Sequence, residues 1–213
     1  MIEIRTTPAT WNSTSRDCLY DPETGHEYQR IVGGVGFPVS EPGFACLLGQ
    51  ALHPNPQTKL RDISILTEIR RDSAHELFAG IEDLHWRYGS PKWFGDTTDE
   101  ARMILLHQWN KTKAEKRKIR LVNAPGVELP GSFQTGLRMI RDAIKSHRKV
   151  LQFKGSTLRD ELTNMGPDPN PVPAKYPAMA ALAYALMALM VYEPGPARFR
   201  GVEYVPLDDV VGI

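Results

Sequence analysis

One acidic side chain, Asp96, stands where its type and position can support metal chemistry. It follows a short apolar run, residues 93–95, and precedes a helix-like stretch that begins near Glu100, in the segment KWFGDTTDEARMILLHQW. Aspartate is disfavoured inside strands and favoured in turns and helix caps. Two interpretations therefore stay open. Asp96 begins the loop and caps the next helix, or it is one ligand of a divalent metal ion.

Basic side chains are concentrated in one window of the chain and suggest a second kind of chemistry. Residues 111–154 contain twelve Lys or Arg and three acidic residues, a net charge of +9, whereas the whole chain carries +1. A surface of this charge suits the phosphates of a nucleic acid, and the alternative is a solvated helix face. The predicted nucleic-acid contacts are Lys113, Lys116, Arg117, Lys118, Arg138, Arg141 and Lys145.

The composition is that of an ordinary globular protein. The 213 residues are 41% hydrophobic and 24% charged, which allows one sizeable core. Cys46 lies in an apolar run, and a reduced, buried thiol there is typical of a cytosolic protein. Residues 177–192 are apolar but shorter than the roughly 20 residues that cross a bilayer, so they predict a buried helix and no membrane partner.

Hydrophobic periodicity predicts the elements that must position these residues. Three apolar runs with turn residues between them, 30–38, 43–52 and 59–71, predict an antiparallel meander. Ser73 with Glu76 forms a capping box before a helix, and Thr97 with Glu100 repeats it after a fourth strand. The remaining predicted elements are a strand at 118–124, a helix at 132–148, a short strand at 149–153, a short helix after Ser156 and an Ala-rich helix from Pro177.

Three antiparallel strands followed by β-α-β crossovers predict an α/β protein with a mixed sheet and helices on both faces. This element order resembles the ribonuclease H-like fold. That resemblance implies acidic residues from the first strand, the fourth strand and a late helix around two metal ions. The domain is predicted to span residues 30–195, after an irregular arm (1–29) and before a tail (196–213).

Four stretches of the chain resemble the C-terminal nuclease domain of the phage terminase large subunit, the motor protein that packages and cuts viral DNA. They are GGVGFPVSEPGFACLLG, ILTEIRRDSAHELFAGIEDLHWRYG, KWFGDTTDE, and the tail STLRDELTNM with YPAMAALAYALMAL. The likeness covers residues 28–192 and depends on the order and spacing of the stretches. It implies double-stranded DNA and phage packaging proteins as partners, in the cytoplasm of the host.

Two of the three carboxylates that this resemblance implies are missing. The first-strand Asp falls at Gly36 and the late-helix Asp at Ala180, so Asp96 alone remains. Two-metal hydrolysis needs several carboxylates around a pair of ions, so one aspartate is expected to hold Mg²⁺ or Mn²⁺ weakly and not as a pair. The sequence also lacks a Walker-type Gly-x-x-x-x-Gly-Lys-Ser/Thr, so no nucleotide cofactor is expected.

Other acidic residues are candidates to replace the missing ligands. Glu68, on the third predicted strand, is the first candidate catalytic partner of Asp96. Further candidates are Glu41, Asp99, Glu100, Asp160 and Glu161. The preferred hypothesis is a protein with the terminase nuclease fold and a degenerate site, which binds nucleic acid or a packaging complex. The alternatives are an active Mg²⁺- or Mn²⁺-dependent endonuclease that uses substitute carboxylates, and a protein-interaction module without a nucleic-acid role.

Overall fold

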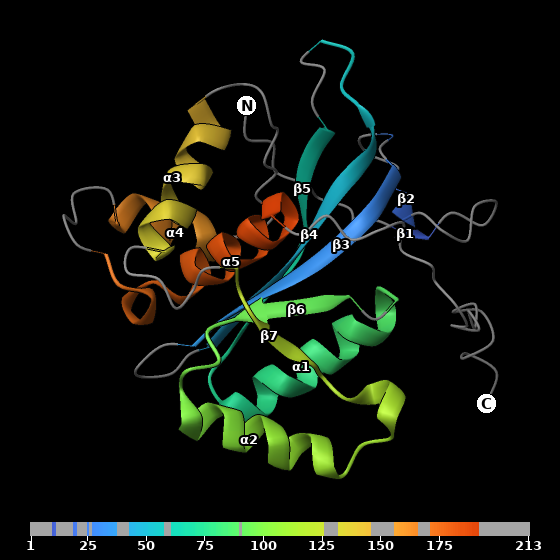
Figure 1. Cartoon of the computed structure of the whole chain (residues 1–213), viewed down its shortest axis with the longest axis vertical. Helices are drawn as coiled ribbons and strands as arrows, with labels where there is room; N and C mark the ends of the chain where they lie inside the picture. Colours follow the sequence, from blue (N-terminus) through green and yellow to red (C-terminus); the bar gives the residue numbers. More distant parts are fainter. Residues whose placement is uncertain are drawn as a thin grey trace.

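The computed structural model describes residues 10–11, 19–20, 25, 27–37, 43–57, 61–89, 91–125, 132–145, 156–165 and 171–191. Their strands form one mixed sheet, and helices cover both of its faces (Figure 1). The predicted tail at 196–213 and the predicted short strand at 149–153 lie outside these residues.

A long antiparallel meander forms the centre of the sheet. β3 (Glu27–Gly36) pairs with β4 (Gly43–Pro54), which pairs with β5 (Arg61–Arg71). On the other edge of β3, β6 (Lys92–Gly95) runs parallel to it, and β7 (Leu121–Asn123) runs parallel to β6. The strand order β5-β4-β3-β6-β7 confirms the predicted mixed sheet with parallel crossovers.

Two short strands from the predicted irregular arm extend the sheet. β1 (Thr10–Trp11) pairs with β2 (Leu19–Tyr20), and β2 pairs with the start of β3. Leu19 is buried in the same core as Tyr28. Part of the arm therefore belongs to the folded domain.

Helices occupy the two faces of the sheet in separate layers. α1 (Ala74–Arg87) and α2 (Glu100–Lys111) cover one face. α3 (Ser132–Lys145), α4 (Ser156–Asn164) and α5 (Pro177–Val191) cover the other. In Figure 1, α1 and α2 lie below the sheet, and α3, α4 and α5 lie above and to the left. None of the described helices is long and apolar enough to span a membrane.

Side-chain alternation along the central strands gives each layer its own core. On β4, Phe44, Cys46 and Leu48 pack toward α5, while Ala45 and Leu47 pack toward α1. This is the pattern expected of a strand that is buried on both faces.

The two predicted helix starts differ in which residue caps them. Ser73 is the N-cap of α1, and its side chain accepts from the Glu76 N–H, as the capping box predicted. At α2 the cap is Asp99 and not Thr97, because the Asp99 side chain accepts from the Arg102 N–H. The helix therefore begins at Glu100, and residues 96–99 form the loop between β6 and α2.

α5 lies unusually close to β3 because both elements carry small side chains where they touch. A Cβ atom added at Gly34 would lie 1.8 Å from the Ala181 carbonyl oxygen. One added at Gly36 would lie 1.9 Å from the Pro177 carbonyl oxygen. The alanines of α5 are fully buried, so the helix backbone itself forms part of the core.

Candidate functional site

The end of β3, the end of β6 and the start of α5 meet at one place. The parallel register pairs Gly34 with Phe94, so two residues further on Asp96 comes beside Gly36. Gly36 contacts the first residue of α5, Pro177. Ala180 lies one turn further along this helix, and Tyr184 one turn beyond Ala180.

The Asp96 carboxylate lies near α5, because its charge acts on the Tyr184 hydroxyl. Burial raises the pKa of the Tyr184 hydroxyl, and the nearby charge of Asp96 raises it further. Ala180 lies four residues before Tyr184, so the two side chains are on the same face of α5. The three positions that the resemblance singled out, Gly36, Asp96 and Ala180, are therefore brought together.

The space that a first-strand carboxylate would need is filled by α5. At 1.9 Å from the Pro177 oxygen, not even a Cβ atom fits at Gly36 without displacing backbone. Ala180 is 1% exposed and packs in the core. Glycine at position 36 is therefore a packing requirement of this chain.

Asp96 forms a turn with the residues that follow it. Its Oδ1 accepts hydrogen bonds from the Thr98 N–H at 2.9 Å and from the Thr98 hydroxyl at 2.6 Å. The Thr97 N–H and hydroxyl donate to Asn123 Oδ1 on β7, at 2.9 and 2.6 Å. Of the two initial interpretations, the loop-forming role of Asp96 is seen directly. The helix-capping role belongs to Asp99.

The turn predicts different effects for two substitutions of Asp96. Asn accepts the same hydrogen bonds from Thr98, so Asp96→Asn is expected to leave the free energy of unfolding nearly unchanged. Asp96→Ala removes both bonds and is expected to cost about 1 kcal/mol. Urea unfolding of the two variants measures this difference. Equal losses in both variants would show that the negative charge, and not the turn, stabilises this loop.

Glu68 is not brought to Asp96, which corrects the expectation from the sequence. Glu68 was predicted to be a partner of Asp96, but the sheet order places β4 between β5, which carries Glu68, and β3. β6, which leads to Asp96, lies on the far side of β3. From β5 to β6 there are three strand spacings, which amount to about 14 Å across the sheet. At that separation, carboxylates on the two strands are too far apart to hold one ion.

Glu68 instead faces a second carboxylate, Glu161 on α4. Burial and the charge of Glu161 raise the pKa of Glu68 to about 7. Glu161 accepts hydrogen bonds from the Met179 N–H, at 3.0 Å, and from the Ala178 N–H, so it caps the start of α5. No three His, Cys, Asp or Glu side chains in the described part of the chain are grouped to hold a metal ion. Sequence reasoning named Glu161 but missed this capping role.

Cys46 lies beneath this pair, opposite Glu68 in the β4–β5 register. It is a buried free cysteine, as predicted. Burial is the main reason that the pKa of its thiol is raised, and the charge of Glu68 adds to it. A thiol held in its neutral form is a poor nucleophile and metal ligand.

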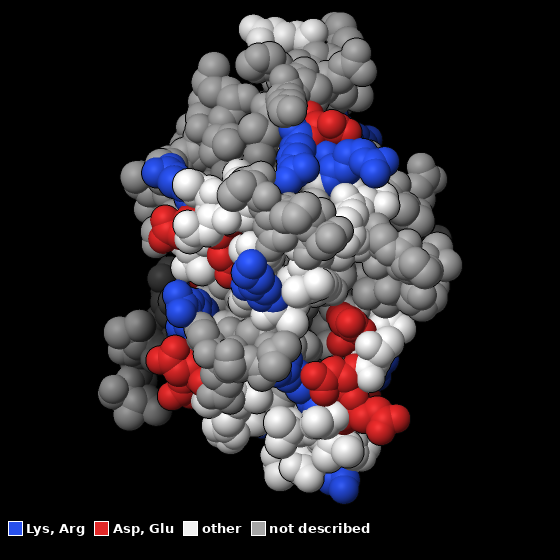
Figure 2. All heavy atoms as spheres, turned by 90° about the vertical axis from the view of Figure 1, so that its left-hand side faces the viewer, with Lys and Arg blue, Asp and Glu red and all other residues white. Residues whose placement is uncertain are grey.

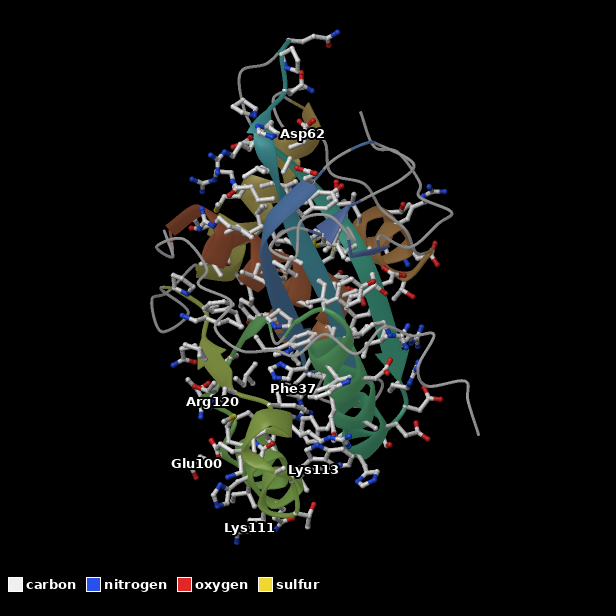
Figure 3. The ribbon with its side chains drawn as sticks, turned by 90° about the vertical axis from the view of Figure 1, so that its right-hand side faces the viewer. Phe37, Asp62, Glu100, Lys111, Lys113 and Arg120 are labelled. Atoms are coloured by element: carbon white, nitrogen blue, oxygen red, sulfur yellow. The ribbon has the colours of Figure 1, made fainter. Side chains whose placement is uncertain are left out.

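Four of the seven predicted nucleic-acid contacts surround the 3-10 turn η1 (Glu115–Arg117), on the α1 side of the sheet. Glu82 pairs with Lys113 at 2.7 Å and with Arg117 at 3.8 Å. Glu115 pairs with Lys118 and with Arg120, each at 2.6 Å. Figure 3 shows Lys111, Lys113 and Arg120 at this end of the molecule, opposite Asp62. Glu82 and Glu115 thus offset positive charge on the η1 surface, which consists of Lys113, Arg117, Lys118 and Arg120.

The other predicted contacts lie on α3, on the opposite face of the sheet from η1 (Figure 1). Phe133, Leu137 and Ile140 are buried against α5, which leaves Arg138 and Arg141 exposed. These two arginines make no ion pair with any described residue. The structure describes no side-chain environment for Lys116 or Lys145.

The basic window of the sequence is therefore divided between two surfaces. Figure 2, which views the molecule from the α3 side, shows the described Lys and Arg side chains in small separate groups with Asp and Glu side chains between them. A continuous positive surface, as the sequence alone suggested, is not formed by the described residues. Of the predicted contacts whose side chains the structure describes, Arg138 and Arg141 are the two that are exposed and make no ion pair.

The antiparallel meander, the two parallel crossovers and the helices on both faces define a ribonuclease H-like fold. Within this class, the meeting point of β3, β6 and α5 is where the resemblance places the acidic site.

Comparison with solved structures narrows the fold to that of large terminase nuclease domains. The large terminase from a thermophilic bacteriophage superposes with a TM-score of 0.52 and 12% identity, over 78% of this chain and 40% of that one. The nuclease domain of the bacteriophage SPP1 large terminase, solved with bound Mn, gives 0.51 and 14%, over 75% and 86%. The nuclease of the thermophilic phage G20c gives 0.50 and 15%, over 87% and 92%.

The chain thus has the terminase nuclease fold, as the sequence motifs predicted, and spans about 40% of the first of these three proteins. At these identities the likeness establishes the fold. No known family profile and no curated protein matches the sequence.

Proposed function

We propose that this protein has the terminase nuclease fold without two-metal nuclease activity, and that it acts by binding DNA within a packaging complex. The observation that carries the proposal is the contact of α5 with Gly36, where a Cβ atom would lie 1.9 Å from the Pro177 oxygen. Two-metal hydrolysis requires carboxylates on both sides of an ion pair. Here the helix backbone occupies one of those positions.

The residues present do not fit a pair of divalent ions. The SPP1 nuclease domain was solved with bound Mn. Glu161, beside the first turn of α5, already accepts hydrogen bonds from the Ala178 and Met179 N–H groups. Asp96 is the carboxylate at the end of β6, and its Oδ1 already accepts two bonds from Thr98. One remaining oxygen is a weak site for Mg²⁺, which is normally bound by several oxygen ligands. The alternative of an active endonuclease loses its proposed second ligand, because Glu68 lies three strands from β6.

Exposed arginines on α3 support the DNA-binding half of the proposal. Arg138 and Arg141 are one turn apart on a helix whose other face is buried. Arginine side chains in this arrangement bind phosphates without reading bases, which suits a protein that holds DNA of any sequence.

A plasmid cleavage assay tests the loss of activity. The purified protein is incubated with supercoiled plasmid and either Mg²⁺ or Mn²⁺, beside the G20c nuclease as a positive control. We expect no nicking above that of Asp96→Asn, a variant that keeps the turn. Metal-dependent cutting by the wild-type protein that disappears in Asp96→Asn would overturn the proposal.

Duplex binding at two salt concentrations tests the DNA-binding role. Fluorescence anisotropy of a labelled duplex is measured at about 50 mM and about 200 mM salt. We expect binding at the lower concentration that weakens at least several-fold at the higher one, because phosphate contacts release counterions. Absence of binding at low salt would remove the DNA role and favour the protein-interaction alternative.

A further inference from the structure

Glu68 on β5 and Glu161 on α4 are near each other, because the charge of Glu161 acts on the Glu68 carboxyl. Glu68 is half-buried on the α5 face of the sheet, and its Oε2 is buried without a hydrogen-bond partner. Glu161 reaches across from α4 and holds the first turn of α5 through the Ala178 and Met179 N–H groups. The same turn covers Gly36, through Pro177. The carboxylate pair thus lies beside the segment that closes the candidate site.

Among the described residues, Arg70 is a cation whose charge acts on the pair. It follows Glu68 on the same face of β5, and it favours the ionised form of Glu161. Further titratable or charged groups on the packed elements include Cys46 on β4, Arg159 and Asp160 on α4, and Tyr184 on α5. Arg159 and Asp160 are exposed, and Cys46 and Tyr184 are held neutral by burial. Repulsion within the pair is therefore only partly offset.

Glu68 is the member of the pair that takes up a proton first. Glu161 receives two backbone hydrogen bonds, which favour its charged form and oppose the effect of burial on its pKa. The Oε2 atom of Glu68 accepts no hydrogen bond from the described residues. Burial together with the charge of Glu161 raises the pKa of Glu68 from 4.5 to about 7.

We propose that Glu68 and Glu161 form a pH-sensitive latch that seats the first turn of α5 on the sheet. With a proton on Glu68, the pair carries one charge, and Glu161 holds the α5 amides without repulsion. With both groups ionised, the two charges repel each other, and the contact between α4, β5 and the start of α5 weakens. The latch thereby controls how firmly α5 covers Gly36 and the neighbouring Asp96.

The direction of the pH effect follows from proton binding. Between the ordinary Glu pKa of 4.5 and the folded-state value of about 7, the folded protein holds a proton on Glu68 that the unfolded chain has released. The free energy of unfolding therefore decreases as pH rises through this window, and the Glu68 contribution is constant above it. The protection of the first-turn amides of α5 is expected to decrease over the same window.

The wild-type protein allows a direct test. The side-chain carboxyl carbon of Glu68 is followed by NMR as pH is raised. We expect Glu68 to titrate with a midpoint near 7, well above the ordinary Glu value of 4.5. A Glu68 midpoint at or below 4.5 would overturn the latch.

Two variants test whether the pair, and not burial alone, controls α5. Hydrogen-exchange protection of the Ala178 and Met179 amides is measured against pH, corrected for intrinsic exchange. Glu68→Gln is expected to keep the protection at its low-pH level throughout, whereas the control Glu76→Gln keeps the wild-type decrease. In Glu161→Gln the Glu68 midpoint is expected to move to lower pH. A decrease that persists in Glu68→Gln, or an unmoved midpoint in Glu161→Gln, would contradict the proposal.

Discussion

Replacing Gly36 with Asp is expected to destabilise the protein by about 3 kcal/mol or more, and not to create a metal site. The new Cβ atom would lie 1.9 Å from the Pro177 oxygen and 2.7 Å from its carbonyl carbon, so the backbone of α5 would have to move. The atoms in the way belong to backbone and not to a flexible side chain. A carboxylate that the movement leaves buried without a partner adds a further cost.

Chemical denaturation of Gly36→Ala and Gly36→Asp separates the two costs. Because both variants carry the Cβ atom, most of the loss is expected already in Gly36→Ala. Val122→Asp serves as the control, since it adds the same carboxylate to a strand at a side chain that is 46% exposed. A Gly36→Asp variant that is as stable as Val122→Asp, or that gains Mn²⁺-dependent cleavage, would show that α5 yields to the carboxylate and would refute a packing requirement for glycine.

Local sequence signals predicted most of the fold. The alternation in the three long strands and the four-residue spacings in the helices each depend on which face of one element is buried, so they can be read from the chain. The cap at Ser73 was predicted for the same reason, because its partner Glu76 is three residues away. The cap at α2 was misassigned because Thr97, Asp99 and Asp96 are all suitable side chains within one turn.

The arrangement of the site was only partly predictable, because it depends on how distant elements pack. The sequence alone shows that positions 36 and 180 carry no carboxylate. It does not show that α5 fills the space above Gly36. Glu68 was named as a partner of Asp96, but the residues of one strand do not show which strands lie beside it. In the structure, β4 lies between β5 and β3. The basic window was treated as one surface, although η1 lies on one face of the sheet and α3 on the other.

The close packing at the candidate site has its physical origin in α5. Small side chains on the helix and on β3 allow backbone-to-backbone contact at Gly34 and Gly36, and that contact leaves no room for a Cβ atom at either glycine. Glu161 holds the first turn of α5 through the Met179 N–H, and it lies beside Glu68, whose pKa is raised to about 7. The proposed loss of activity and the proposed latch therefore concern the same helix, yet they are tested by separate measurements.

Removing the two exposed arginines of α3 is expected to weaken DNA binding more than removing two cations of the η1 surface. Arg138 and Arg141 have no ion-pair partner in the described part of the chain, so their full charge is available to phosphates. Lys118 and Arg120 are each 2.6 Å from Glu115, and binding a phosphate would first require that contact to break. Exposed pairs of this kind contribute little stability, but they lower the gain from any new contact.

The two surfaces can be compared with double variants that remove the same charge. Arg138→Ala/Arg141→Ala is expected to lower duplex affinity about tenfold at low salt and to reduce the slope of log K against log salt by about 2. Lys118→Ala/Arg120→Ala, the matched control, is expected to change the affinity by less than about threefold, because Glu115 already offsets those charges. Thermal unfolding checks that both variants remain folded. Equal losses in the two would show that binding depends on net charge alone, and a larger loss in the control would place the DNA on the η1 surface.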